Sequence, residues 1–293
     1  MIVIGLRNGT ELAVKLAKEL KSKYSPLFIH EFPDGEFKLR YDVPLRGQDV
    51  VLVQSLSIRP NDYLVELLIA IETAKQLGAT KVTVVLPYLC YARQDVAFQP
   101  GEGISAFVVT DLINYSGADE VYTVMTHIHR VPTLRKLFHL PGENVAPFQE
   151  MANWISKNAN LKDVVLVGPD WESKNVVDPV ANILRVPVAY FEKVRSGNRK
   201  VKQTLKGTPN VKGKTAVILD DTISTGMTIQ GAAQTLKKLG VKKIMVGTVH
   251  LMGDEGAKRC LKLTKLFAAS DSIPNKYVKF SCASSIAKAM QKN

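Results

Sequence analysis

The feature that most constrains the fold is an alternation of short β-branched runs with amphipathic stretches of helical period, which continues almost from end to end. Runs such as Lys81–Leu86 and Thr215–Leu219 have the length of a strand and are largely apolar, as in strands buried on both faces of a sheet. Because helical stretches such as Asp62–Leu77 separate these runs, the pattern is typical of βαβ units. The sequence therefore predicts an α/β fold with mainly parallel sheets flanked by helices.

Two sets of these units are expected. Pro and Gly interrupt both periodicities at Leu140–Asn144, and a chain of 293 residues is long enough for about two domains. We therefore predict an N-terminal domain at residues 1–143 and a C-terminal domain at residues 144–283. The terminal segment 284–293, with a helix near Ser284–Gln291, is a candidate to pack back on the first domain.

The expected strands of the first set are 49–53, 81–86 and 120–125, and those of the second set are 163–167, 187–191, 215–219, 243–250 and 266–269. The expected helices are 11–22, 62–77, 104–115 and 132–138 in the first set, and 174–184, 228–239 and 254–263 in the second. The N-terminal run Met1–Gly5 also resembles a strand.

The formal net charge of +12 would suit nucleic acid, an acidic membrane surface or a small polyanionic substrate. Much of this charge lies in Lys193–Lys214, which contains eight Lys and Arg residues and no acidic residue. Taken alone, this segment fits a solvated loop as well as a phosphate-binding one. Because there is no recognised nucleic-acid motif and no series of stacking aromatics, we predict no nucleic-acid partner.

The chain shows neither a signal peptide nor an apolar run long enough to cross a membrane, so we expect a cytoplasmic protein without a membrane partner. Its three cysteines, Cys90, Cys260 and Cys282, are odd in number and widely spaced. They form neither a C-x-x-C pair nor a metal-ligand cluster. We expect buried small hydrophobes in a reducing compartment.

The strongest functional motif follows the expected strand Thr215–Leu219. Asp220 and Asp221 come directly after the strand, and Thr225-Gly226-Met227-Thr228 leads into a helix. Glycine lets a backbone approach a phosphate closely, and the free N–H groups of a helix start favour an anion. Hydroxyl groups from Ser224, Thr225 and Thr228 can donate to phosphate oxygens, while the two carboxylates suit sugar hydroxyls or hydrated Mg²⁺. An ordinary helix N-cap is the structural alternative.

This strand, acid pair and T-G-x-T turn together resemble the 5-phosphoribosyl 1-diphosphate loop of type I phosphoribosyltransferases and of ribose-phosphate pyrophosphokinases. The loop alone does not choose between these two groups. Two segments of the first half do: Phe32-Pro33-Asp34-Gly35-Glu36 resembles the F-x-D-G-E segment of the pyrophosphokinases, and Pro87–Asp95 resembles their P-Y-x-x-Y-A-R-Q-D segment.

Further segments continue the resemblance over nearly the whole chain. Gly168-Pro169-Asp170 is similar to the family's S/G-P-D turn, Glu192–Arg195 to its flexible K-x-R loop, and Asp271–Pro274 to its D-T/S-I-P segment. The chain thus resembles a ribose-phosphate pyrophosphokinase, or phosphoribosyl pyrophosphate synthetase. That resemblance implies two phosphoribosyltransferase-like domains, with transfer of the ATP diphosphate to ribose 5-phosphate, Mg²⁺ as cofactor and at least a homodimer.

The resemblance also implies the roles of individual residues. Those expected to bind ATP are Phe32, Asp34, Gly35, Glu36, Arg93, Gln94, Asp95 and His127. Those expected to bind ribose 5-phosphate are Asp220, Asp221, Ser224, Thr225, Gly226, Met227 and Thr228. Lys193 and Arg195 are expected to stabilise the transition state, and His127 and Asp170 to lie at the metal.

Four departures from the family pattern favour an alternative function, that of a weakly active or inactive regulatory paralogue. Met125 stands where an acid is usual, and Val96-Ala97 stands where basic residues are usual. Trp171-Glu172-Ser173 replaces a Gly-rich turn, and a ligand approaching that backbone would be crowded by Trp171. The phosphate loop itself carries Ser224 and Met227 in place of an acid and a glycine. Retention of Lys193, Arg195 and the acid pair argues against the alternative.

Overall fold

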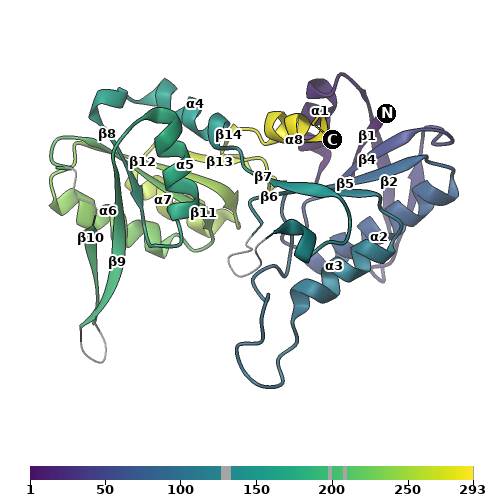
Figure 1. Cartoon of the computed structure of the whole chain (residues 1–293), viewed down its shortest axis with the longest axis horizontal. Helices are drawn as coiled ribbons and strands as arrows, with labels where there is room; N and C mark the ends of the chain where they lie inside the picture. The colour runs from purple at the N-terminus through teal and green to yellow at the C-terminus, as the bar shows by residue number, and fades with distance from the viewer. Residues whose placement is uncertain (127–132, 197–199, 207–209, 293) are drawn as a thin grey trace. The chain divides into compact units, whose positions relative to one another are not determined.

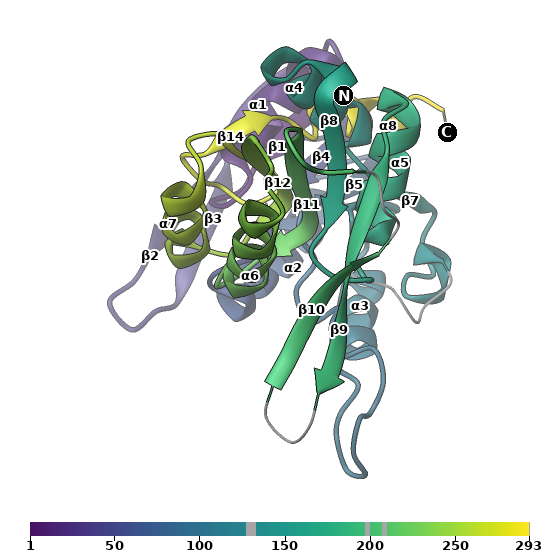
Figure 2. The ribbon, with the colours of Figure 1, turned by 90° about the vertical axis from the view of Figure 1, so that its left-hand side faces the viewer.

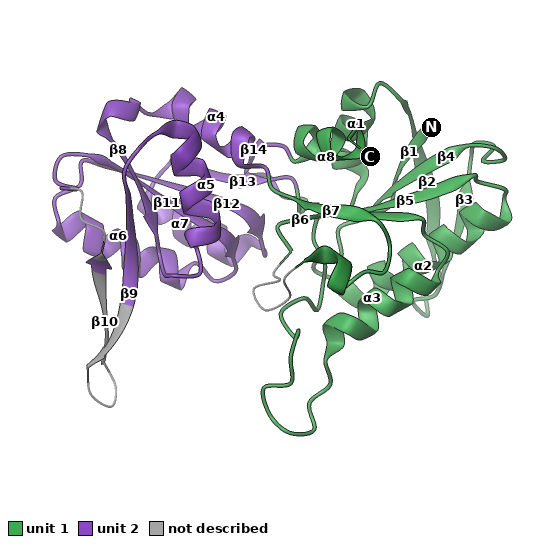
Figure 3. Cartoon of the chain, in the orientation of Figure 1, with its two compact units in different colours: residues 1–146, 272–274, 282–293 green, residues 147–271, 275–281 purple. Residues whose placement is uncertain are grey.

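The computed structural model of the chain describes residues 1–126, 133–196, 200–206 and 210–292, without the side chains of residues 193–196, 200–204 and 206. The chain forms two compact units (Figure 3). Unit 1 comprises Met1–Ala146, Ser272–Pro274 and Cys282–Asn293, and unit 2 comprises Pro147–Asp271 and Asn275–Ser281. The first crossing therefore follows Ala146, three residues beyond the predicted boundary, and the chain returns to unit 1 twice.

Unit 1 is built on a seven-stranded sheet of order β3-β2-β1-β4-β5-β6-β7. Its strands are β1 (Ile2–Gly5), β2 (Lys23–Glu31), β3 (Phe37–Tyr41), β4 (Asp49–Val53), β5 (Lys81–Leu86), β6 (Glu120–Val124) and β7 (Gly142–Val145). All neighbouring strands are parallel except β2 and β3. Figure 1 shows α1 (Thr10–Glu19) and α8 (Ala283–Met290) on one face, and α2 (Pro60–Gln76) and α3 (Ser105–Tyr115) on the other.

Unit 2 repeats this strand order as β10-β9-β8-β11-β12-β13-β14. Its strands are β8 (Val164–Gly168), β9 (Val188–Ser196), β10 (Lys200–Lys206), β11 (Thr215–Ile223), β12 (Lys243–Leu251), β13 (Phe267–Ser270) and β14 (Val278–Phe280). The edge strand β10 is antiparallel to β9, as β3 is to β2. The helices α6 (Met227–Lys238) and α7 (Asp254–Leu263) cover one face, and α4 (Phe148–Asn158) and α5 (Lys174–Leu184) the other (Figure 2).

Helical periodicity and strand burial build the cores of both units. In α2, Leu64, Leu67 and Ile71 are spaced to share one side of the helix, and they pack on buried side chains such as Leu52 and Val84 of the sheet. Because helices cover both faces of a parallel sheet, its strands are apolar at successive positions rather than at alternate ones. This explains why the central strands were recognisable from the sequence.

Several predicted elements are confirmed, including every strand of the two predicted sets. The helix expected at 132–138 is wrong, since among its described residues only Leu134–Lys136 forms a single 3₁₀ turn. The segment that resembles the family's flexible loop forms strands instead. Lys193–Ser196 continues β9, and Lys200–Lys206 pairs with it as β10. Its side chains are polar enough to suggest a loop, but backbone pairing at the sheet edge needs no apolar sequence.

The C-terminal helix α8 packs against α1 and β7 of unit 1, as its predicted position allowed. The expectation that the cysteines are buried is confirmed, and none of the three forms a disulfide. Within the described part of the chain, no helix combines the length and apolarity needed to cross a bilayer.

One buried carboxylate ties three elements of unit 1 together. Glu66 of α2 is fully buried, and its Oε2 accepts a hydrogen bond from Arg7 Nε at 2.6 Å. Its Oε1 accepts from Gln54 Nε2 at 2.9 Å and from the Arg7 backbone N–H at 3.2 Å. Arg7 follows β1 and Gln54 follows β4, so the carboxylate joins the ends of two neighbouring strands to the helix.

We predict that Arg7→Ala destabilises the protein by about 3 kcal/mol, because it leaves the buried Glu66 carboxylate without its cation. The measurement is the free energy of unfolding in urea. Arg40→Ala is the control, since Arg40 pairs with Asp42 at 2.7 Å but is 66% exposed, and its loss should cost about 0.5 kcal/mol or less. Equal losses in the two variants would contradict the prediction.

Candidate active site

The phosphate loop lies at the carboxyl edge of the sheet of unit 2. The β11 strand pairs with β8 only as far as Ile218, but it pairs with β12 through Ile223 opposite Leu251. The prediction that this strand ends at Leu219 is therefore wrong, because β12 continues and holds its neighbour extended. As a result Asp220 and Asp221 lie within the strand, beyond the point where its pairing with β8 stops.

A tight turn connects this strand to α6. Gly226 has φ of +73° in the left-handed region and is the N-cap of the helix. A Cβ at this position would come within 3.1 Å of the Gly256 carbonyl oxygen, so a larger residue would be both strained and crowded. The turn thus places the free N–H groups of the start of α6 beside the loop, as an anion site requires.

The side chains expected to donate to phosphate are accessible there. Ser224 and Thr225 are exposed, and Thr228 is half-buried in the first turn of α6. Met227, which replaces a frequent glycine, is 64% exposed, so its side chain leaves the core of the loop clear. The substitution keeps the backbone N–H that a phosphate would use.

Three carboxylates cluster beside this loop. The pKa of Asp220 is raised well above its usual value, first by burial and then by the charges of Asp221 and Asp170. Asp170 belongs to the turn that follows β8, so parallel strands have brought residues 50 positions apart to one edge. Such a group can accept hydrogen bonds from sugar hydroxyls or balance a cation.

The carboxylates of this cluster could take part in holding a magnesium ion. Among the described residues, no three His, Cys, Asp or Glu side chains form a ready metal cage. Mg²⁺ commonly takes one or two protein carboxylates and completes its shell with phosphate oxygens and water. The charge crowding around Asp220 is relieved by a bound cation, so these residues suit that mode of binding.

The F-x-D-G-E segment forms the turn between β2 and β3 in unit 1. The Phe32 N–H donates to the Glu36 carbonyl at 2.7 Å, and Gly35, with φ of +91°, closes the turn back to Phe32. The Phe32 ring is exposed between His30, at 5.0 Å between ring centroids, and the ammonium group of Lys38, at 5.8 Å. Asp34 and Glu36 are also exposed. The turn therefore exposes an aromatic ring and two carboxylates to solvent.

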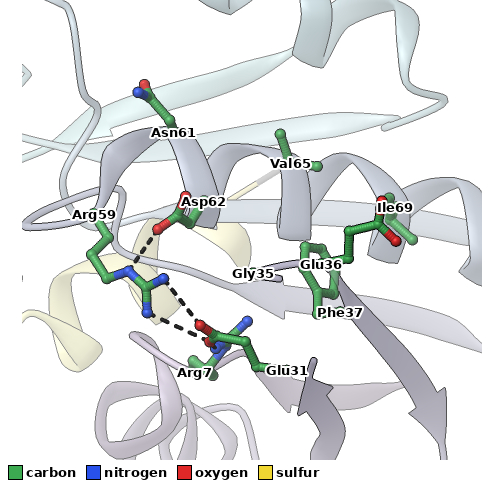
Figure 4. Close-up of a pocket in the computed structure, with 10 residues that line it drawn as sticks. All are labelled: Arg7, Glu31, Gly35, Glu36, Phe37, Arg59, Asn61, Asp62, Val65 and Ile69. Carbon is green, nitrogen blue, oxygen red and sulfur yellow. Dashed lines mark hydrogen bonds and ion pairs between the residues drawn. The ribbon is translucent and has the colours of Figure 1, made fainter. Parts of the chain in front are cut away.

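A pocket of about 430 Å³ lies beside this turn, and Gly35 and Glu36 belong to its wall (Figure 4). Two arginines meet at Glu31, the last residue of β2: Arg7 forms an ion pair with it, and Arg59 Nη2 donates to its Oε1 at 3.2 Å. Arg59 also donates to Asp62 at 2.6 Å. These contacts tie the base of the turn to the start of α2.

The sequence analysis missed this cluster. Arg7, Glu31 and Arg59 are separated by 24 residues or more, and nothing in their local pattern predicts that they meet. The three residues come together only because β1 pairs with both β2 and β4.

The R-Q-D segment follows β5 in the same unit. Arg93 is exposed and Asp95 is buried, while the Gln94 amide donates to Glu102 and to the Val96 carbonyl, each at 3.2 Å. The Gln94 amide nitrogen is therefore already engaged within its own loop. Tyr91 donates to Asn61, which connects this segment to the pocket beside the F-x-D-G-E turn.

The structure describes three of the predicted site residues only in part or not at all. Lys193 and Arg195 belong to β9 by their backbone, opposite Gln203 and Val201 of β10, and their side chains are outside the described residues. His127 also lies outside the described residues. The preceding Thr126 N–H donates to Asn144 at 2.9 Å, which joins the end of β6 to β7.

Two repeated α/β units, with a glycine-capped phosphate loop in the second, define a phosphoribosyltransferase-like transferase architecture. The family model for the N-terminal domain of ribose phosphate pyrophosphokinase matches residues 1–117, and that for the phosphoribosyl transferase domain matches residues 144–283. The chain belongs to the ribose-phosphate pyrophosphokinase family, whose members are enzymes.

Relatives match over almost the full length. A ribose-phosphate pyrophosphokinase of Methanopyrus kandleri is 32% identical over 293 residues, covering 99% of each chain. One of Methanobrevibacter smithii is 36% identical over 87% of this chain and 88% of its own. Among solved structures, the phosphoribosylpyrophosphate synthetase from Mycobacterium smegmatis has a TM-score of 0.85 at 29% identity, covering 99% of this chain and 97% of its own. The predicted fold class and family are confirmed.

We predict that Asp220→Asn stabilises the ligand-free protein at neutral pH. The folded-state pKa of Asp220 is raised from a usual value of 3.8, so its contribution to stability is present below that value and is lost as pH rises through the raised pKa. The variant should therefore melt at a higher temperature than the parent chain at pH 7, with a smaller difference near pH 4. Asp163→Asn, at an exposed position, is the control and should track the parent chain. A parent-like pH profile for Asp220→Asn would refute the assignment.

Proposed function

We propose that this chain transfers the β,γ-diphosphate of ATP to the 1-hydroxyl of ribose 5-phosphate, giving 5-phosphoribosyl 1-diphosphate and AMP. The observation that carries the proposal is the phosphate loop at Asp220–Thr228, set in a chain that matches ribose-phosphate pyrophosphokinases over 99% of its length. The loop accounts for the sugar phosphate, and the first unit contains the segments expected for ATP.

In the proposed complex, the 5-phosphate lies at the start of α6. Backbone N–H groups and the hydroxyls of Ser224, Thr225 and Thr228 donate to its oxygens. Asp220 and Asp221 accept hydrogen bonds from the ribose hydroxyls. This arrangement holds the sugar at both ends and limits the directions in which its 1-hydroxyl can point.

ATP is proposed to bind to unit 1. The exposed Phe32 ring stacks on the adenine, and Asp34 and Glu36 accept hydrogen bonds from its amino group. Arg93, which is exposed after β5, is proposed to pair with phosphate oxygens as a planar fork. Gln94 and Asp95 support that segment, since Gln94 bonds within its loop and Asp95 is buried.

The chemistry is an in-line displacement. The oxygen of the 1-hydroxyl bonds to the β-phosphorus, the bond from that phosphorus to the oxygen shared with the α-phosphate breaks, and AMP leaves. Mg²⁺ would neutralise charge on the phosphate oxygens, and His127 and Asp170 are the residues proposed to lie at the metal. Lys193 and Arg195 are proposed to stabilise the negative charge that develops on the diphosphate oxygens during transfer.

We further propose that the enzyme works in the cytoplasm as a homodimer or a higher homo-oligomer. Three free, buried thiols fit a reducing compartment. Size-exclusion chromatography with light scattering measures the assembly directly, and a monomer at micromolar concentration would rule this part out.

The proposal predicts AMP formation that requires all of ATP, Mg²⁺ and ribose 5-phosphate. Product is measured by chromatography of the nucleotides, with omission of the sugar as the control for simple hydrolysis. A folded sample that yields no sugar-dependent AMP with Mg²⁺ or Mn²⁺ would overturn the catalytic proposal. Activity that appears only on mixing with a second pyrophosphokinase would favour the regulatory paralogue, for which Met125 and Val96-Ala97 are the motivating departures.

The Lys193 assignment has its own test. Lys193→Ala should lower kcat by about 10²-fold or more while leaving ribose 5-phosphate affinity within about threefold, because the ammonium group is expected to act mainly in the transition state. Lys212→Ala is the matched control, since Lys212 belongs to the same basic segment and is exposed. An unchanged kcat in Lys193→Ala would reject the role.

A further inference from the structure

The turn that departs most from the family pattern, Pro169–Ser173, is a defined structure. Ser173 is 1% exposed, and its Oγ donates to the Asp170 carbonyl at 2.6 Å. Its backbone N–H donates to the Asp170 carboxylate at 3.2 Å. These two bonds hold the turn at the start of α5 and orient the Asp170 side chain. Ser173 thus stabilises a compact turn where the family commonly has glycines.

Trp171 has a fixed support in this turn. Its ring meets Tyr190 of β9 edge to face, with 5.7 Å between centroids and 62° between planes. The Lys174 ammonium lies 5.7 Å from the Trp171 centroid and 5.3 Å from that of Tyr190. Lys174 and the Tyr190 hydroxyl both bind the Asp178 carboxylate. Contacts with Tyr190 and Lys174 therefore fix the orientation of the indole, although Trp171 is 58% exposed.

Tyr190 and Ser173 leave no room for a side chain at Gly168. A Cβ on Gly168 would lie 2.5 Å from Cδ1 of Tyr190 and 2.4 Å from Oγ of Ser173. Glycine at the end of β8 therefore allows the tyrosine ring to lie against the backbone and support the tryptophan. Trp171 thus packs against Tyr190 while much of its side chain remains exposed.

Trp171 lines a pocket of about 470 Å³ together with Asp170, Glu172, Phe191 and Glu192. Among the described residues, two aromatic side chains and three carboxylates thus line this pocket. Asp170 follows β8, and β8 pairs with β11, the strand that leads into the phosphate loop. The pocket therefore lies at the same edge of the sheet as the site proposed for the sugar.

We propose that Trp171 is a specificity-determining residue whose indole face stacks on the ribose ring of ribose 5-phosphate while the neighbouring carboxylates accept its hydroxyls. The inference rests on the function proposed above and adds a substrate contact to it. The C–H groups on one side of a furanose ring are apolar and weakly positive, and they match the negative face of an indole. The ring edge carries hydroxyl donors, which match Asp170 and Glu172.

The described lining of the pocket suits the hydroxyl groups of a sugar. Asp170, Glu172 and Glu192 supply acceptor oxygens, and ribose hydroxyls are donors. The phosphate of the sugar is held separately, at the start of α6.

The chain supplies its own probe. It has two tryptophans, and Trp154 is only 8% exposed whereas Trp171 is 58% exposed. We expect ribose 5-phosphate to change the intrinsic fluorescence of the parent protein, and the change to vanish in Trp171→Phe. Inorganic phosphate and ATP with Mg²⁺ are titrated as controls and should not reproduce it. Binding of the sugar phosphate is measured in parallel by calorimetry, which does not depend on tryptophan.

Kinetics provide the second measurement. Trp171→Ala should raise KM for ribose 5-phosphate roughly three- to tenfold with kcat and KM for ATP within twofold, as expected for loss of one stacking contact. Trp171→Phe should restore most of the sugar affinity, because it keeps an aromatic face. Val14→Ala, at a 47% exposed position on α1 of unit 1, is the control for a general loss of stability.

The outcomes separate the inference from the function on which it rests. Calorimetric binding of the sugar without a Trp171 signal, or an unchanged KM in Trp171→Ala, overturns the stacking contact and leaves the pyrophosphokinase proposal intact. A signal caused by ATP alone assigns the indole to the nucleotide and also overturns it. Absence of any sugar binding by the parent chain overturns both.

Discussion

Parallel pairing of strands is the constraint on which the rest of this structure depends. It brings the carboxyl ends of neighbouring strands to one edge of each sheet, so loops that are distant in sequence converge there. In unit 2 this edge collects Asp170 after β8 and Asp220 at the far end of β11. In unit 1 the corresponding edge collects Arg7 after β1 and Gln54 after β4. The two sheets have the same strand order, but the charged residues at this edge differ between them.

The two units treat carboxylates with little solvent exposure in opposite ways. Glu66 is neutralised by Arg7 and hydrogen-bonded by Gln54, so its charge holds the loops together. Asp220 instead stands beside two further acids, and its pKa is raised by burial and by their charges. Burial of the Glu66 carboxylate costs desolvation free energy, and the neighbouring Arg7 cation offsets that cost. The second arrangement disfavours the charged form of Asp220, which a proton, a cation or a hydrogen-bond donor would relieve, and perturbed groups of this kind are common at functional sites.

The departures from the family pattern acquire different meanings once they are placed. Met227 is exposed at the start of α6, so it leaves the backbone of the phosphate turn intact. Trp171 was expected to crowd a ligand at this backbone. In the structure Ser173 hydrogen-bonds the turn, and the indole packs edge to face against Tyr190.

Local sequence was enough for the α/β class, most central strands and helices, the phosphate turn and the family, because buried parallel strands and glycine-dependent turns leave local patterns. Gly226 and Gly35, for example, adopt the positive φ angles that only glycine takes readily, within the motifs recognised in the sequence. Edge strands such as β3 and β10 escaped prediction because they are specified by a neighbour rather than by their own periodicity. The Arg7–Glu31–Arg59 cluster and the support of Trp171 by Tyr190 could be decided only by the tertiary structure. Contacts between residues far apart in the chain depend on strand order and register, and a single sequence contains no local signal for either.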